Sequence, residues 1–201
     1  MTRILVTGFG PFGQYTVNPS WEAVKALPPV VNETTEVVTR HVAVAYDVVR
    51  KAIPEWLEEL RPDCVINVGV GEQGCLKLET VAHNSGYVKP DINGNLPPNG
   101  CVVDGNSSDT INTDLEVDRL LALIKPKWKC SRSTDAGRFL CEFIYYTSLH
   151  QSTQTVTTTG GHPQCLFVHL PPVGAPYSQE ELNNALKLII ESIDTKFRMK
   201  Q

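Results

Sequence analysis

One cysteine, Cys141, lies where the sequence TDAGRFLCEF (134–143) passes from a turn-forming Asp-Ala-Gly into an apolar helical pattern. The start of a helix favours the thiolate form of a cysteine, because the helix dipole and free backbone N–H groups stabilise negative charge. The neighbouring Arg138 is expected to act in the same direction. A thiolate is a nucleophile, so this position predicts covalent catalysis. The alternative is plain core packing, since free cysteine is among the most buried residue types.

A cysteine nucleophile needs a base, and His169 is the best placed of the five histidines. It closes the apolar run QCLFVHL (164–170), which predicts the carboxyl end of a strand, where ligands bind in α/β folds. A third group should orient the imidazole, and Glu79 follows the most buried predicted strand by a loop long enough to return to the same edge. The ordinary alternatives are a core histidine with one backbone bond and a solvated glutamate.

The segment ILVTGFGPFG (4–13) contains the pattern G-x-G-x-x-G after a predicted strand, which is typical of dinucleotide sites. That site requires a helix to open within the glycine run. Here Pro11 and Phe12 occupy the turn, and the first helix start signal comes later, at Asn18. We therefore interpret Phe9 and Phe12 as walls of a small apolar pocket, with core packing and a nucleotide site as the alternatives.

The composition is that of an ordinary globular protein, with 201 residues, 41% hydrophobic and 20% charged residues and a net charge of -4. This length fits a single domain, 1–201. Scattered basic residues argue against nucleic acid, and no apolar run approaches the ~20 residues of a membrane span. The start reads as a strand rather than a signal peptide, and the six cysteines lack metal-site spacing. We expect reduced thiols, no bound metal and a cytoplasmic location.

Strand and helix patterns alternate along most of the chain. Strands are predicted at 3–9, 35–46, 63–71, 127–133 and 164–170, and helices at 18–27, 46–60 (kinked or restarted at Pro54), 112–124, 137–152 and 178–197. Asn18 and Ser178 are the expected N-caps of the first and last helices. Between 72 and 111 the pattern breaks into extended pieces around a Pro/Gly/Asn-rich loop. Such alternation predicts an α/β/α sandwich, a mostly parallel twisted sheet with helices on both faces.

Four segments together resemble the pyroglutamyl peptidase I family: TGFGPFG…TVNPSWEAV (7–24), LETVAHN (78–84), DAGRFLCEFIYYTSLHQS (135–152) and FVHLPPVGAPYSQEEL (167–182). They occur in the family's order and span nearly the whole chain. The third segment, with HNSGY (83–87), looks more like the animal-type enzymes than the bacterial ones. The resemblance implies a cysteine peptidase that removes an N-terminal pyroglutamyl residue from peptides without a cofactor.

The resemblance also implies roles for particular residues. The family's catalytic triad falls on Glu79, Cys141 and His169. Its substrate contacts fall on two ring-gripping phenylalanines, Phe9 and Phe12, on lactam-binding backbone at Asn18 and Val70, and on apolar side chains at Phe139 and Leu140. The bacterial pattern has an arginine where this chain has Lys89, so no role is carried over to that cation.

Two further expectations concern assembly and activity. The stretch 90–111 differs most from bacterial relatives, so their oligomer contacts are not carried over and a monomer is favoured. The alternative to an enzyme is an inactive relative that binds pyroglutamyl peptides or a protein partner. The presence of all three triad residue types argues for the enzyme.

Overall fold

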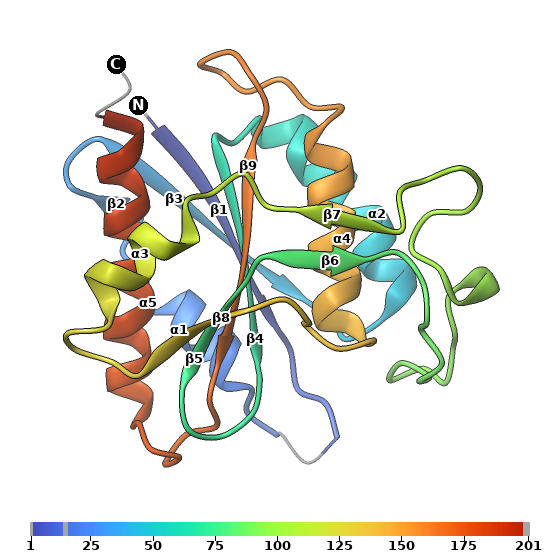
Figure 1. The fold of residues 1–201 in the computed structure, drawn as a ribbon, viewed down its shortest axis with the longest axis horizontal. Helices are drawn as coiled ribbons and strands as arrows, with labels where there is room; N and C mark the ends of the chain where they lie inside the picture. Colours follow the sequence, from blue (N-terminus) through green and yellow to red (C-terminus); the bar gives the residue numbers. More distant parts are fainter. Residues whose placement is uncertain (1, 14–15, 199–201) are drawn as a thin grey trace.

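The computed structural model describes residues 2–13 and 16–198 (Figure 1). Its strands are β1 (Thr2–Phe9), β2 (Val30–Val31), β3 (Thr35–Val42), β4 (Cys64–Val70), β5 (Leu76–Glu79), β6 (Val81–His83), β7 (Thr110–Asn112), β8 (Cys130–Ser133) and β9 (Gln164–Leu170). Its helices are α1 (Pro19–Lys25), α2 (Tyr46–Leu60), α3 (Val117–Ile124), α4 (Leu140–Ser152) and α5 (Gln179–Arg198), with a short 3-10 turn at Pro98–Gly100.

Seven strands form one mixed sheet in the order β2-β3-β1-β4-β9-β5-β8. The central strands β3, β1, β4 and β9 run parallel to one another, so their carboxyl ends meet at one edge, while the short β2 pairs antiparallel with β3. β5 runs antiparallel to β9, and β8 runs parallel to β5. The mostly parallel sheet is therefore confirmed, and its reversed part brings the end of β5 back along β9.

Helices cover both faces of the sheet, as the α/β/α expectation requires (Figure 1). On one face, residues of α1, α3 and α5 pack with side chains such as Ile4 and Ile66. On the other face, α2 and α4 pack with the alternate residues of the same strands, such as Leu5 and Val65. Strands buried on both faces read as continuous apolar runs, which is why they could be found in the sequence. None of the helices in the described part of the chain is long and apolar enough to cross a bilayer.

The bounds of α2 match the prediction, whereas the starts of α3 and α4 lie later than predicted. α2 passes through Pro54 without restarting, since Val49, Ile53 and Leu57 form one buried stripe along it. α3 starts only at Val117, because residues 110–112 pair as β7 and a turn follows, in which Leu115 N donates to Thr113 Oγ1. α4 starts at Leu140 rather than at 137, so Cys141 is its second residue.

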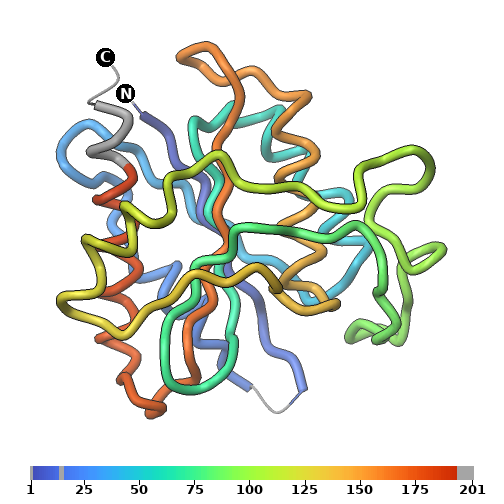
Figure 2. Tube along the Cα trace, in the orientation of Figure 1, coloured from blue at the N-terminus to red at the C-terminus, as the bar shows by residue number. Residues whose placement is uncertain are grey.

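A small two-stranded sheet of β6 and β7 emerges from the stretch that the sequence left irregular. Its strands run side by side across α4 (Figure 2). The extended piece at 100–105 contributes only one isolated bridge within the described chain, between Ser85 and Cys101. This layer holds the segment after Glu79 against the helix that carries Cys141.

The capping box predicted at the start of the last helix is present. Ser178 Oγ accepts from Glu181 N at 3.2 Å, and Ser178 N donates to Glu181 Oε2 at 2.8 Å. We expect Ser178→Ala to lower the free energy of unfolding by about 1 kcal/mol in urea titration, since the N–H group of Glu181 loses its side-chain acceptor. The control is Ser192→Ala in the middle of the same helix, where the hydroxyl bonds back to Leu188 O. Ser192→Ala should leave stability unchanged or raise it, and an equal loss in both would contradict the cap.

Candidate active site

Cys141 lies in the first turn of α4, partly buried against the end of β4. A side chain on Gly69 would place its Cβ 2.9 Å from Cys141 Sγ and 2.8 Å from Phe167 Cζ. Only glycine leaves room for the sulfur there. Phe139 is the N-cap of the helix and makes no side-chain capping bond, so the first-turn N–H groups have no side-chain acceptor from it. Cys141 therefore lies among backbone donors, as the sequence predicted.

His169 lies at the carboxyl end of β9, in register with Gly69 of β4 on one side and Lys77 of β5 on the other. Its Nδ1 lies 2.8 Å from Glu79 Oε1. The Cys141 side chain also acts on this imidazole, since it is among the groups that raise the His169 pKa, and with Nδ1 facing Glu79, the nitrogen left for sulfur is Nε2. A Cβ at Gly71 would come within 2.9 Å of His169 Cβ, so a second glycine allows this close approach.

Glu79 is fully buried at the end of β5, which excludes the solvated alternative for its side chain. The antiparallel pairing of β5 with β9 places it there. Its backbone carbonyl accepts from the Tyr145 hydroxyl of α4 at 2.9 Å, which ties the strand to the cysteine helix. Oε2 is buried and has no hydrogen-bond partner among the residues that the structure describes. A buried carboxylate is costly without compensation, so the contact with His169 stabilises both groups.

The pKa of His169 reflects competing influences. Burial alone would lower it, but the hydrogen bonds and charges of Cys141 and Glu79 outweigh burial and raise the pKa from 6.5 to about 9. The imidazole is thus held in its charged form by a thiol on one side and a carboxylate on the other. In such a pair the imidazole already carries the proton of the sulfur and can deliver it to a leaving group.

The two phenylalanines differ in their surroundings. Phe9, the last residue of β1, is only 3% exposed and belongs to the core cluster beneath α2 and α4, so core packing holds for Phe9. Phe12 is partly buried and packs on the edge of the same cluster. The structure therefore separates two residues that the sequence treated alike.

Asn18 is the N-cap of α1, as predicted, and its side-chain amide makes three hydrogen bonds. Its Oδ1 accepts from Ser20 N at 3.0 Å and from Ser20 Oγ at 2.8 Å, while Nδ2 donates to Gly10 O at 2.8 Å. These bonds close the loop that carries Phe12.

The glycine run has a packing role that needs no nucleotide. A Cβ at Gly8 would lie 2.9 Å from Ser20 O and Trp21 Cα, so this glycine lets α1 approach β1. A Cβ at Gly10 would lie 2.7 Å from His41 Nε2. α1 begins at Pro19, well beyond the glycines, as the sequence predicted.

The other three candidate contacts lie around Cys141 and the end of β4. Val70 is the last residue of β4 and partly buried. Phe139 is partly buried with its ring edge-to-face against Tyr46 at 6.1 Å between centroids. Leu140 is only 1% exposed and belongs to the core beneath α4. Leu140 therefore supports the site from below.

The structure corrects one electrostatic expectation and leaves another without support. Arg138 Nη1 donates to Asp135 Oδ1 at 2.7 Å and to Glu142 Oε2 at 2.6 Å, so two carboxylates offset the charge that was expected to act on the thiol. Lys89 is exposed, and its backbone carbonyl accepts from the Tyr46 hydroxyl. The sequence reasoning missed Glu142, together with Gly69 and Gly71. Glycine at a strand end, in NVGVG, was the signal for the last two.

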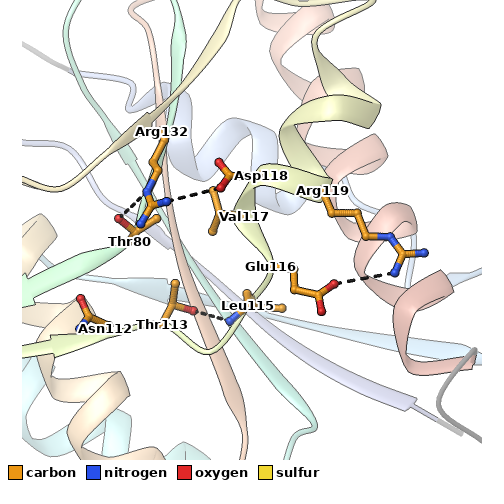
Figure 3. Close-up of a pocket in the computed structure, with 9 residues that line it drawn as sticks. All are labelled: Thr80, Asn112, Thr113, Leu115, Glu116, Val117, Asp118, Arg119 and Arg132. Atoms are coloured by element: carbon orange, nitrogen blue, oxygen red, sulfur yellow. Dashed lines mark hydrogen bonds and ion pairs between the residues drawn. The ribbon is translucent and has the colours of Figure 1, made fainter.

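A separate pocket lies on the α3 side, around Arg132 (Figure 3). Arg132 reaches Asp118 and Thr80 at 3.4 Å each, and Arg119 pairs with Glu116 at 3.7 Å. The positive charges of Arg132 and Arg119 are thus paired with carboxylates of the same pocket. Thr80 adjoins Glu79 in sequence, but the residues that line this pocket include none of the nine candidates from the sequence.

Comparison with known proteins places the chain among relatives of one family. The family model of the pyroglutamyl peptidases matches residues 2–193. Pyroglutamyl-peptidase 1 of Homo sapiens is 36% identical over 195 residues, which cover 94% of this chain and 88% of that protein. Pyrrolidone-carboxylate peptidase of Thermococcus onnurineus is 33% identical over 172 residues, covering 84% of this chain and 83% of that protein.

Solved structures share the architecture. Pyroglutamyl peptidase I from Bacillus amyloliquefaciens superposes with a TM-score of 0.84 at 27% identity, covering 96% of both chains. Pyrrolidone carboxyl peptidase from Thermococcus litoralis gives 0.89 at 21% identity, covering 100% of this chain and 97% of the other. The fold is that of the pyrrolidone carboxyl peptidases. With the family model matching nearly end to end, the chain belongs to the pyroglutamyl peptidase family.

The raised pKa of His169 predicts a pH dependence of stability. The folded protein keeps the His169 proton up to about pH 9, whereas an unfolded histidine releases it near 6.5. The extra stability is therefore complete below pH 6.5 and is lost as the pH rises to 9, by about 3 kcal/mol in total. We expect the difference in unfolding free energy between wild type and His169→Asn to shrink over this window, measured by urea titration. A difference independent of pH would contradict the ion pair.

Proposed function

We propose that this protein is a cysteine peptidase that hydrolyses the bond after an N-terminal pyroglutamyl residue of peptides. The observation that carries the proposal is the chain of contacts from Cys141 through His169 to the buried Glu79. In a member of this family, these groups are a nucleophile, a base and an orienting acid. We further propose that residues 1–201 act as one catalytic domain, as a monomer in the cytoplasm.

The substrate has a five-membered lactam in place of a charged amine. Its pocket needs apolar walls, together with one donor and one acceptor for the lactam C=O and N–H. In our proposal Phe12 and Phe139 provide apolar surface, and Phe9 supports it from the core. The backbone at Asn18 and Val70 provides the polar contacts. Proline has no ring carbonyl. A site built to donate a hydrogen bond to that carbonyl therefore rejects proline, because the donor of the site would remain buried and unpaired.

The reaction starts when the Cys141 thiolate, whose proton His169 already holds, attacks the carbonyl carbon. The oxygen becomes an oxyanion that accepts hydrogen bonds from first-turn N–H groups of α4, including that of Cys141. His169 then gives its proton to the leaving amine, and the C–N bond breaks to leave a thioester. Water attacks the thioester as His169 takes its proton. The C–S bond then breaks, which releases pyroglutamate and restores the thiolate beside the charged imidazole, and Glu79 stabilises that charge.

An inactive binding relative is the second candidate, and activity decides between the two. We expect the protein to release aminocoumarin from a pyroglutamyl-aminocoumarin substrate, and a thiol alkylator to stop it. Cys141→Ser should abolish turnover with little change in melting temperature, since serine is similar in size but forms no anion at neutral pH. Cys75→Ser, a change at a partly buried thiol outside the triad, is the matched control. Full activity in Cys141→Ser, or loss only in Cys75→Ser, would overturn the assignment.

The pocket can be tested with the two phenylalanines. Phe12→Ala removes apolar contact with the lactam, so KM should rise or kcat/KM fall with a small change in melting temperature. Phe9→Ala opens a cavity in the core and should lower stability by ~3–5 kcal/mol. Steady-state kinetics and thermal melts of both variants provide the measurement. A Phe12→Ala protein that melts far lower with an unchanged KM would make Phe12 a core residue.

A further inference from the structure

A second polar cluster lies beside the nucleophile and takes no part in the proposed reaction. Its centre is Glu142, the residue after Cys141, whose side chain is fully buried. Oε1 of this carboxylate lies 2.6 Å from His83 Nδ1, and Oε2 lies 2.6 Å from Arg138 Nη1. An ionised carboxylate only accepts hydrogen bonds, so both partners donate to it.

The cluster joins three segments of the chain. His83 belongs to β6, and its carbonyl accepts from the Tyr87 hydroxyl at 2.6 Å. Arg138 belongs to the turn before α4 and also binds Asp135, whose carboxylate accepts from Gly137 N at 3.0 Å. Glu142 belongs to the first turn of α4 itself. The contacts thus fix the backbone at the point where the helix begins.

Burying these charged groups costs more free energy than a purely structural contact requires. Burial raises the pKa of Glu142, and the hydrogen bonds and charges of His83 and Arg138 act against that rise. An apolar side chain of similar size would pack a helix without removing charges from water. The charges are therefore better explained by an effect on the neighbouring thiol than by packing.

A bound metal ion is a weaker explanation. His83, Asp135 and Glu142 offer possible ligand atoms within 4.8 Å of one another. The Arg138 guanidinium already donates to both carboxylates, so positive charge is supplied from within the chain.

We propose that Glu142 is a positioning residue for Cys141: with His83 and Arg138 it fixes the first turn of α4, and it offsets the charge of Arg138 beside the thiolate. This role rests on the proposed function and extends it. It holds the sulfur and the oxyanion donors in one rigid turn. The charged and titratable groups around this turn are His169 on β9, Glu79 on β5, His83 on β6, Tyr87 after it, and Asp135, Arg138 and Glu142 at the start of α4.

The test compares two variants that change the charge in opposite directions. Glu142→Gln leaves Arg138 less compensated, and Arg138→Met removes the positive charge and leaves Glu142. The first readout is the rate of Cys141 alkylation by iodoacetamide against pH, with Cys141→Ser as the blank for other thiols. We expect the midpoint to move to lower pH in Glu142→Gln and to higher pH in Arg138→Met. A structural defect alone would change the alkylation rate of both variants but would not move their alkylation midpoints in opposite directions.

The second readout is steady-state kinetics. Both variants should lose about tenfold or more in kcat while KM stays within about twofold, because a displaced nucleophile affects the chemical step more than binding. Glu142→Asp retains the charge, so its alkylation midpoint should match wild type and its kcat should lie between those of wild type and Glu142→Gln.

The control is Asp63→Asn, a buried carboxylate at the amino end of β4 that accepts from Arg3 N at 2.8 Å. It should lower stability without moving the alkylation midpoint. Unshifted midpoints in Glu142→Gln and Arg138→Met, or a shift in Asp63→Asn of the same size, would overturn the proposal. If Glu142→Gln does not fold, an unshifted Arg138→Met suffices to overturn it. Wild type that alkylates normally but cleaves no pyroglutamyl substrate would refute the proposed function instead.

Discussion

The hydrogen bond between Glu79 and His169 is the interaction on which the arrangement of this sheet edge depends. A carboxylate with no solvent exposure requires a partner of opposite charge, and the imidazole of His169 is that partner. The two can meet only because β5 reverses direction and pairs with β9. In a fully parallel sheet, a loop would have to bring Glu79 back to His169. The antiparallel part of an otherwise parallel sheet is thus a requirement of the site.

Close approach is the second requirement, and glycines meet it. Gly69 makes room for the sulfur and Gly71 for the imidazole, while Gly8 and Gly10 let α1 and His41 pack against the end of β1. These glycines lie at the carboxyl edge of neighbouring strands. The first two glycines of the G-x-G-x-x-G pattern therefore allow tight packing between backbone and side chains, a physical need that dinucleotide sites share with this fold.

Much of the architecture could be predicted because its strands are buried on both faces. Such strands, β1, β4 and β9 among them, appear as continuous apolar runs with clear ends. The N-caps at Asn18 and Ser178 were also evident, because capping depends on a few adjacent residues. The pairing of β6 with β7 depends on residues some 30 positions apart, and the direction of β5 depends on its partner. Neither leaves a local pattern.

The residues of the candidate site could likewise be predicted only in part. Cys141 and His169 could be chosen because helix starts and strand ends are visible in sequence. The burial of Glu79 and of Glu142 could not be predicted, since an isolated glutamate reads as a surface residue and only the fold supplies the partners His169, His83 and Arg138. Phe9 and Phe12 looked equivalent because the predicted end of the strand at 9 does not show which of the two rings the helices cover.

The burial of α4 has a consequence for how this protein can diversify. Ten of its thirteen residues are buried, so the helix that carries Cys141 is also a main component of the core beneath it. Mutations along α4 would alter folding and reactivity together, which leaves natural selection little freedom there. Substitutions are more readily accommodated in the exposed loops between 85 and 109, where Val88, Ile92 and Leu96 face solvent. Cys141 is thus fixed by a buried helix, whereas the surface loops are freer to change.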